Sequence, residues 1–278
     1  MNNNYCTFKL YNSLQIPCLA IGFYQISDKN ELKNIIRNAF KVGIRHFDSA
    51  AAYNNESILG EVLRELKINR EEIFISSKVR NEDQGYESTI KAYNKTINDL
   101  GVQYLDQYLI HWAVKDRFFE TWKAMEYLYI SKKVKAIGVS NFLVHHLQYL
   151  FDNSDIKPMV NQIEHHPYLT SPELVHFCKK NKIIVEAYSA LMRGQFNNIK
   201  VLSDLSKKYN KTKSQILLRW NIQKNIIPIF KSATLKRITE NSNLFDFSIN
   251  NDDMLLLDLL NKNKRLEPSS DPDNIVLD

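Results

Sequence analysis

A chain of 278 residues, 44% hydrophobic and 24% charged, has a globular composition and is long enough for one large α/β domain or two small ones. The 37 Lys and Arg residues exceed the 31 Asp and Glu residues by only six, and they are scattered, so the charge does not favour nucleic-acid binding. No apolar run approaches the roughly 20 residues of a membrane span. The polar residues 1–4 also lack the apolar core of a signal peptide, so we expect a cytoplasmic protein with no membrane partner.

The N-terminal segment predicts a small β-hairpin, with strands at 8–10 and 15–17 around Asn12 and Ser13. After it, short apolar runs alternate with longer segments of helical periodicity, such as 31–40 and 201–209. The expected strands are 19–23, 44–47, 73–77, 105–110, 134–139, 159–163, 183–187 and 226–230.

The expected helices have recognisable starts, at Asp28 and at Ser171 followed by Pro172. The strand runs are apolar on both faces, which is typical of a parallel sheet that is buried on both sides. Eight strand–helix units without a linker predict a TIM (β/α)₈ barrel with an N-terminal β-hairpin, forming a single domain over residues 1–278.

Polar or amphipathic residues follow nearly every expected strand. Because TIM barrels place their chemistry at the carboxyl ends of the strands, we expect these residues to form one ring around a site. They are Tyr24, Asp48, Lys78, His111, Ser140, Asn141, Gln162, Glu164, Tyr188, Ser189, Lys231 and Ser232.

Four residues of this region suit proton transfer to a carbonyl oxygen: Asp48, Tyr53, Lys78 and His111. The phenol of Tyr53 has an ordinary pKa of about 10, and a lysine beside it should lower that pKa. Asp48 would hold Lys78 in place, while His111 would donate a hydrogen bond to the substrate oxygen. Taken singly, Asp48 and Lys78 could be a structural ion pair, and Tyr53 and His111 could be packing residues.

Several stretches resemble the hallmark sequences of the aldo-keto reductases, and in particular the short-loop microbial carbonyl reductases of the 2,5-diketogluconate reductase type. The resemblance runs in order from Leu14 to the tail at 271–273 and is carried by 47–53, 109–112, 138–142 and 229–234, with Arg237, Glu240 and Asn241 after them. It implies an NADPH-dependent oxidoreductase that reduces aldehydes or ketones to alcohols, with Tyr53 as the proton donor. The alternative is an NADPH-binding regulatory or scaffold protein with little turnover. Without a coiled-coil segment, we expect a monomer.

No Gly-x-Gly-x-x-Gly motif follows a strand, so the sequence does not support a Rossmann-type cofactor site. The cofactor that the resemblance implies is NADPH/NADP⁺, bound extended across the mouth of the barrel. Tyr188 would stack on the nicotinamide, while Ser140, Asn141 and Gln162 would bind its carboxamide and Asp48 would lie near the ribose. Further cofactor contacts are expected from Gly22, Tyr24, Ser189 and Leu191.

A phosphate site is expected at the other end of the cofactor. Lys231, Ser232 and Arg237 lie around an expected helix start after the last strand, where TIM barrels often bind phosphate. The resemblance assigns these residues to the 2′-phosphate, with Glu240 and Asn241 near the adenine. Alternatively, both cations could be ordinary surface charges.

The expected substrate-binding residues are Tyr24, Arg80, His111 and Trp112. Tyr24 stands where the family often has tryptophan, and Arg80 where an aromatic residue is usual. Arg80 could bind a carboxylate or phosphate of an anionic substrate, or it could simply extend into solvent.

Cysteine and histidine spacing predicts no metal site. Cys6, Cys18 and Cys178 have no CxxC or metal-ligand spacing, so they are expected to be inert thiols in a reducing compartment. The pairs 145–146 and 165–166 are adjacent histidines whose side chains should point in different directions.

Overall fold

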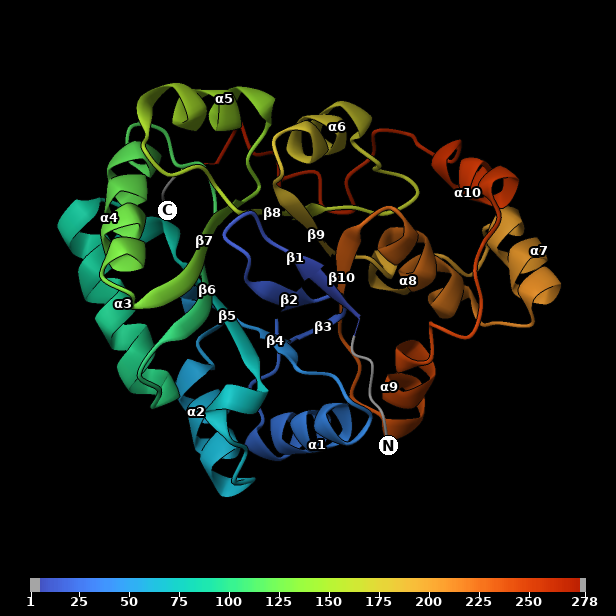
Figure 1. Ribbon diagram of the computed structural model, residues 1–278. Helices are drawn as coiled ribbons and strands as arrows, with labels where there is room; N and C mark the ends of the chain where they lie inside the picture. The colour runs from blue at the N-terminus through green and yellow to red at the C-terminus, as the bar shows by residue number, and fades with distance from the viewer. Residues whose placement is uncertain (1–5, 276–278) are drawn as a thin grey trace.

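Eight parallel strands close into a barrel in the computed structural model, which describes residues 6–275 (Figure 1). Neighbours around the barrel follow chain order, and β10 pairs with both β9 and β3 to close it. The predicted TIM barrel is therefore confirmed. The strands are β3 (Ala20–Gly22), β4 (His46–Asp48), β5 (Phe74–Val79), β6 (Leu105–Ile110), β7 (Val134–Ser140), β8 (Val160–Glu164), β9 (Ile184–Tyr188) and β10 (Ile226–Phe230).

Helices surround the barrel and cover the outer face of the strands (Figure 1). One helix follows each strand up to β8, whereas two follow β9 and two follow β10. They are α1 (Lys29–Lys41), α2 (Glu56–Glu65), α3 (Tyr86–Leu100), α4 (Phe118–Ile130), α5 (Val144–Asn153), α6 (Pro172–Lys180), α7 (Lys200–Tyr209), α8 (Lys213–Gln223), α9 (Leu235–Ser242) and α10 (Asn251–Asp258). None of the helices within residues 6–275 is both long and apolar enough to cross a membrane.

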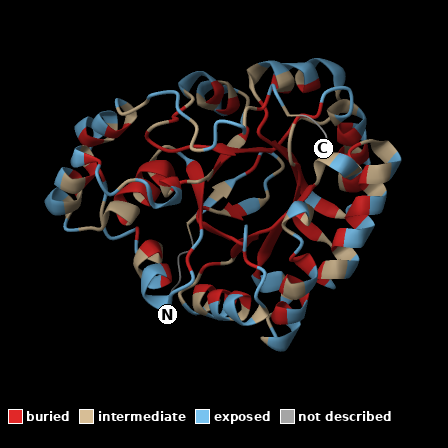
Figure 2. Ribbon diagram, turned by 180° about the vertical axis from the view of Figure 1, so that it is seen from behind, coloured by how far each residue is buried: buried red, intermediate tan, exposed pale blue. Residues whose placement is uncertain are grey.

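The local sequence explains where these helices begin and which face they bury. The Asp28 side chain accepts a hydrogen bond from the backbone N–H of Glu31, so it caps α1 as predicted. At α6, Pro172 occupies the first turn, but Ser171 makes no side-chain cap. The apolar residues of α1 recur every three or four positions and are buried against the strands, as in the other inward faces of the ring (Figure 2).

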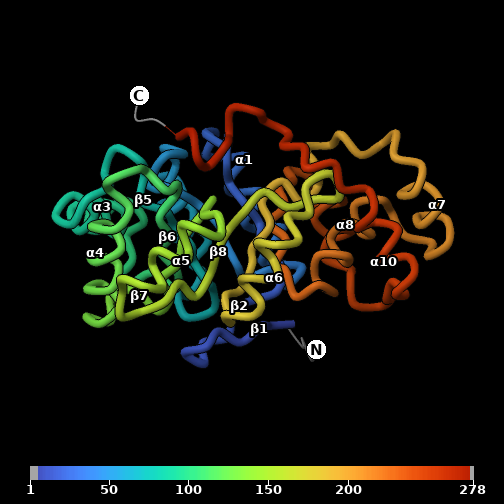
Figure 3. The backbone as a smooth tube through the Cα atoms, turned by 90° about the horizontal axis from the view of Figure 1, so that it is seen from above, coloured from blue at the N-terminus to red at the C-terminus, as the bar shows by residue number. Residues whose placement is uncertain are grey.

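The predicted hairpin is also present and closes one end of the barrel. Strand β1 (Thr7–Lys9) pairs antiparallel with β2 (Gln15–Pro17). Figure 3 shows this hairpin on one side of the barrel, while the segment after α10 crosses the opposite side. Leu10 and Ile16 are buried against the barrel, so the hairpin is part of the hydrophobic core.

Two strand details differ from the prediction and both concern the site. Asp48 is the last residue of β4, and Lys78 lies within β5, where each was expected just after its strand. The strands are also less apolar than expected, because Gln107 and Glu186 are fully buried among them. These groups form a polar layer that continues into the site.

Candidate active site

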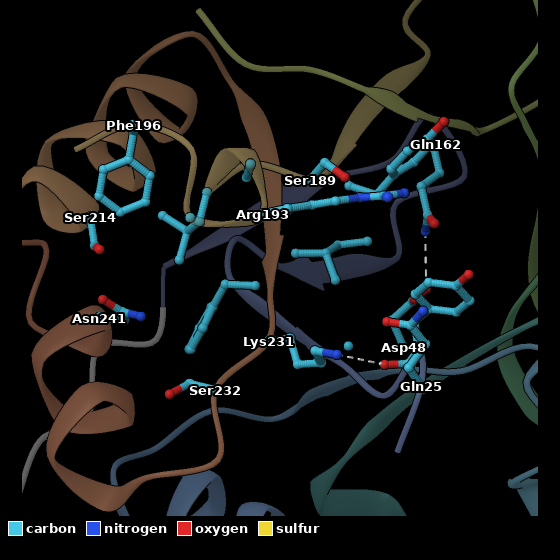
Figure 4. Close-up of a pocket in the computed structure, with 18 of the residues that line it drawn as sticks. Gln25, Asp48, Gln162, Ser189, Arg193, Phe196, Ser214, Lys231, Ser232 and Asn241 are labelled. Atoms are coloured by element: carbon cyan, nitrogen blue, oxygen red, sulfur yellow. Dashed lines mark hydrogen bonds between the residues drawn. The ribbon is translucent and has the colours of Figure 1, made fainter. Parts of the chain in front are cut away.

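A cavity of about 950 Å³ opens at the carboxyl ends of the strands and brings most of the predicted residues together. Figure 4 shows its elongated shape, with Asp48 and Gln162 on one side and Ser214, Ser232 and Asn241 on the other. Of the predicted site residues, those that line it are Gly22, Tyr24, Asp48, Tyr53, His111, Trp112, Ser140, Asn141, Gln162, Tyr188, Ser189, Leu191, Lys231, Ser232, Arg237, Glu240 and Asn241.

Lys78 and Asp48 form a buried ion pair at the base of this cavity. Lys78 Nζ lies 2.8 Å from both carboxylate oxygens of Asp48 and 2.8 Å from the carbonyl oxygen of Ser49. Burial alone would favour the neutral amine, but the attraction of Asp48 and other nearby groups outweighs it and raises the pKa of Lys78 above its ordinary value. Lys78 is therefore a fixed cation, held behind the cavity wall rather than in it.

Tyr53 lies beside this cation. It is the last residue of a short 3₁₀ helix, η1 (Ala51–Tyr53), and Lys78 Nζ lies 5.2 Å from the centre of its ring. Burial raises the pKa of Tyr53 above 10, although Lys78 acts to lower it. The expected lowering is thus present, but desolvation of the phenolate is the larger effect, and the prediction of a net decrease is wrong. Tyr53 is a neutral phenol at neutral pH.

His111 faces Tyr53 from the loop after β6. The two ring centres are 6.1 Å apart in an edge-to-face arrangement, and Trp112 stacks beside the imidazole at 6.4 Å. Burial, together with the charge of Lys78, lowers the pKa of His111 to about 3. The imidazole is consequently neutral at pH 7 and carries one N–H that can donate to a ligand.

Hydrogen-bonding groups from three adjacent strand ends form one wall of the cavity. Asn141 donates from Nδ2 to the carbonyl oxygen of His111 and to Ser140 Oγ, both at 3.1 Å. Ser140 Oγ donates to the carbonyl oxygen of Gln162 at 2.9 Å, and the Tyr188 hydroxyl donates to Asn141 Oδ1 at 2.7 Å. These bonds fix Tyr188 beside a wall of amides and hydroxyls.

Gln162 connects this wall to a second buried carboxylate, Glu186. Its Nε2 group donates to Asp48 Oδ2 at 3.0 Å and to Glu186 Oε2 at 2.7 Å. Glu186 also accepts from Gln107 Nε2 at 3.0 Å. Burial, with the nearby charge of Asp48, raises the pKa of Glu186 to about 7. The sequence analysis did not predict Glu186 as part of the site. Its position inside the apolar strand β9 could have indicated a buried carboxylate.

The opposite end of the cavity contains polar atoms that lack a partner within the described residues. Ser232 Oγ and Asn241 Oδ1 are buried and make no hydrogen bond there. Lys231 and Arg237 are exposed beside them, and α9 begins at the same place with Thr234 as its cap. A buried hydroxyl with two nearby cations at a helix start fits an anionic group such as phosphate.

Comparison with known proteins agrees with this arrangement. Residues 19–262 match the model of the aldo/keto reductase family. The chain belongs to that family. A glyoxal reductase of Bacillus subtilis is 46% identical over 95% of this chain and 96% of its own length. A methylglyoxal reductase of Escherichia coli is 38% identical over 97% of this chain and 98% of its own.

Solved structures of aldo-keto reductases share the fold closely. An aldo-keto reductase from a deep-sea metagenome library of the Medee basin superimposes with a TM-score of 0.92 at 41% identity, covering 98% of this chain and 100% of that one. An aldo-keto reductase of Bombyx mori, solved in complex with NADP, gives a TM-score of 0.89 at 32% identity and covers 97% of each chain. The sequence-based assignment to the aldo-keto reductases is therefore confirmed.

Arg80 is the predicted substrate-binding residue that does not line the cavity of this aldo-keto reductase. Its Nη2 donates to the carbonyl oxygen of Ala51 at 2.6 Å and to Asn54 Oδ1 at 2.9 Å, and its Nε lies 3.7 Å from Asp83. The guanidinium therefore supports the η1 segment that carries Tyr53. This placement gives no support to direct substrate binding by Arg80.

The cavity also contains residues that the sequence reasoning did not include. Most of them lie in the loop after β9 and around the start of α8, whereas Gln25 follows β3 and Ser270 lies in the segment after α10. Their side chains have no strand-end pattern, so spacing could not identify them. They are Gln25, Arg193, Phe196, Asn197, Thr212, Lys213, Ser214 and Ser270.

The side chains of His145 and His146 were expected to point in different directions, but they converge on one carboxylate. The two Nε2 atoms lie 3.1 Å apart, and both approach Asp273 Oδ1, at 3.0 Å from His145 and 3.5 Å from His146. However, His146 Nδ1 accepts the backbone N–H of Leu143 at 3.2 Å, which leaves the proton of the neutral ring on Nε2. That nitrogen is then not free to bind a metal.

Proposed function

We infer that this aldo-keto reductase uses NADPH to reduce aldehydes or ketones to alcohols. One observation carries the proposal: the Asp48–Lys78 ion pair lies behind Tyr53, and Tyr53 and His111 share a cavity that extends to the Ser232 hydroxyl, which has no hydrogen-bond partner among residues 6–275. The proposed proton donor and the proposed anion-binding residues thus line one elongated cavity. A carbonyl reductase that uses a phosphorylated cofactor needs both.

The chain's own residues would provide the proton and the electrostatic stabilisation, whereas NADPH, when bound, supplies the hydride. As negative charge develops on the substrate oxygen, the neutral phenol of Tyr53 donates its proton. The phenolate left behind is stabilised by the fixed charge of Lys78, which Asp48 holds in position. The raised pKa of Tyr53 keeps this proton in place until that moment.

His111 would orient the carbonyl. Because its pKa is lowered to about 3, the imidazole is neutral across the physiological range and donates a hydrogen bond without bringing a charge. That bond points the substrate oxygen toward Tyr53 and supports it as it becomes negative. Tyr24 and Trp112 would form the apolar sides of the substrate pocket.

The cofactor would lie along the length of the cavity. Tyr188 offers a ring face for the nicotinamide, and Ser140, Asn141 and Gln162 offer polar atoms for its carboxamide. At the other end, Lys231, Ser232 and Arg237 would bind the 2′-phosphate, with Glu240 and Asn241 near the adenine. Gly22, Tyr24, Asp48, Ser189 and Leu191 would contact the intervening part.

Small neutral dicarbonyl compounds are the proposed substrate class. Two relatives described above are a glyoxal reductase and a methylglyoxal reductase. In this chain Arg80 is already engaged by Ala51, Asn54 and Asp83, so it offers no free cation to an anionic substrate. This favours glyoxal and methylglyoxal over oxo-acids.

The test is steady-state oxidation of NADPH with glyoxal, methylglyoxal and a set of oxo-acids. We expect turnover with the aldehydes and much less with the oxo-acids. Tight NADPH binding without turnover on any carbonyl compound would contradict the proposal and would favour a regulatory or scaffold role.

A further inference from the structure

Two cysteines face each other across the N-terminal hairpin, at the end of the barrel opposite the cavity. In the pairing of β1 with β2, Thr7 lies opposite Pro17, so the next position outward places Cys6 opposite Cys18. The backbone N–H of Cys18 donates to the carbonyl oxygen of Cys6 at 3.0 Å, which shows that the pairing extends to this position. Residues directly opposite in an antiparallel pair project their side chains to the same face.

This position suits a disulfide bond. In a hydrogen-bonded antiparallel pair the Cα atoms lie about 5.5 Å apart. Disulfides span Cα separations of about 4.4–6.8 Å, so the bond would require little backbone movement. The hydrophobic core includes Cys18, and Cys6 packs against it, so both side chains face the barrel.

The two thiols already interact, and they are not equivalent. A hydrogen bond from Cys18 lowers the pKa of Cys6 to about 7, with Arg219 contributing in the same direction, while the pKa of Cys18 is raised. Cys6 is partly exposed and Cys18 is buried. Cys178 is the matched contrast, because it is buried on α6 and burial raises its pKa to about 12. The sequence-based expectation of three equally inert thiols therefore does not fit Cys6.

We propose that Cys6 and Cys18 form a reversible disulfide when the protein meets a peroxide. The Cys6 thiolate attacks one peroxide oxygen, and for hydrogen peroxide this step gives the sulfenic acid and releases hydroxide, which takes up a proton to become water. The Cys18 sulfur then attacks the Cys6 sulfur, so that the S–S bond forms and a second water leaves. Two thiols lose two electrons and two protons in total, and the peroxide accepts them.

The bond would act on stability rather than on catalysis. It would join the two strands of the hairpin at their open end, on the side of the barrel that Figure 3 shows the hairpin to cover. The cavity lies at the other side, at the carboxyl ends of the strands. A closed loop of this kind limits the conformations of the unfolded chain. Oxidation should thus raise the unfolding temperature and leave turnover unchanged, so this proposal can be tested without reference to the proposed reaction.

The experiment compares the reduced full-length protein before and after treatment with hydrogen peroxide. We expect the three free thiols to fall to one, the intact mass to drop by two hydrogens, and a peptide that links Cys6 to Cys18 to appear. Dithiothreitol should reverse all three changes. The Cys178→Ser control should still form the link, whereas Cys6→Ser and Cys18→Ser should not.

Two results would overturn the proposal. One is a treated protein that keeps all of its thiols under conditions that oxidise glutathione. The other is a stable sulfinic acid at Cys6 while Cys18 remains free. The unfolding temperature of the Cys178→Ser protein gives a separate readout, with an expected rise of a few °C on oxidation.

Discussion

The two ends of the cavity are built in opposite ways. At the end that contains Tyr53, the charges are buried and paired, and Lys78 has no exposed surface. At the other end, Lys231 and Arg237 are exposed, and the buried hydroxyl of Ser232 has no partner within the described residues. At one end the charged side chains of Lys78 and Asp48 are thus paired within the protein, while the other end presents a buried hydroxyl and exposed cations that an anionic ligand would satisfy.

This difference determines how each end responds to its surroundings. Buried charges are weakly screened by salt, so the electrostatic effects near Tyr53 should be almost independent of ionic strength. Exposed cations are screened over a Debye length of about 8–10 Å, so affinity from Lys231 and Arg237 should fall as salt is added. Changes in pH, by contrast, should have their largest effect on the buried titratable groups near Tyr53.

The largest effect is expected from Tyr53→Phe. Loss of the proton donor should lower kcat by about 10²- to 10⁴-fold, with NADPH affinity unchanged because the ring remains. Stopped-flow turnover and fluorescence titration of NADPH measure the two quantities. The matched control is Tyr24→Phe, whose ring lies 5.1 Å from that of Tyr53 and which should retain most activity. Equal losses in the two variants would remove Tyr53 from its proposed role.

Lys78→Met tests the buried ion pair through stability. Removal of the cation leaves the Asp48 carboxylate buried with no opposite charge beside it and only the amide of Gln162 as a donor among residues 6–275, which should cost about 3–5 kcal/mol in the free energy of unfolding. Urea denaturation measures it. Lys224→Met is the control, since Lys224 pairs with Asp258 in a partly exposed bridge and should cost no more than about 1 kcal/mol. Similar costs for both variants would mean that burial of the Lys78 pair has no special effect.

Glu186→Gln tests the polar layer through its pH dependence. Because the pKa of Glu186 is raised to about 7, the folded protein keeps a proton that the unfolded chain loses near pH 4.5. The contribution of Glu186 to the free energy of unfolding should therefore fall as pH rises from 4.5 to 7, by up to about 3 kcal/mol. The variant lacks this loss, so it should match the wild type near pH 5 and exceed it near pH 8. A difference that does not change with pH would contradict this.

Lys231→Ala probes the exposed end and should have a smaller effect. We expect about tenfold weaker NADPH binding, equal to about 1.4 kcal/mol, with little change for NADH. The effect should shrink as salt is raised. Lys236→Ala is the control, since Lys236 is also exposed on α9 but does not line the cavity. Equal weakening for both cofactors would exclude a 2′-phosphate contact by Lys231.

The smallest effect is expected from Arg80→Met. If Arg80 only supports the η1 segment, kcat/KM should change alike for a carboxylated and a neutral aldehyde, within about twofold of each other. A selective loss on the carboxylated aldehyde would instead restore the substrate role that the sequence suggested.

The strand ends could be predicted because the apolar runs and the polar residues after them are local features. The carboxyl ends of parallel strands must meet, so Asp48, Lys78 and His111 were expected at one rim without knowledge of any contact. The Gln162–Glu186 contact could not be predicted in this way, because it depends on the register between the neighbouring strands β8 and β9.

Loop geometry accounts for the other differences. Arg80 turned toward Ala51, and His145 and His146 converged on Asp273, because of backbone paths that no periodicity encodes. The net rise in the pKa of Tyr53 also required the burial around the ring, which spacing alone does not give. The sequence thus indicated which side chains lie near the site, whereas the structure was needed to find their partners and how deeply each one is buried.

The amide of Gln162 has a consequence for ligand recognition. Both of its N–H groups are committed to carboxylates, one to Asp48 and one to Glu186, so its rotamer is set before any ligand arrives. A side chain that is immobilised on binding typically costs about 0.5–1.5 kcal/mol of affinity. In this protein the entropy cost of ordering the Gln162 side chain is already met when the chain folds. Its amide oxygen can only accept a hydrogen bond, so Gln162 favours a ligand that presents an N–H or O–H donor at this position.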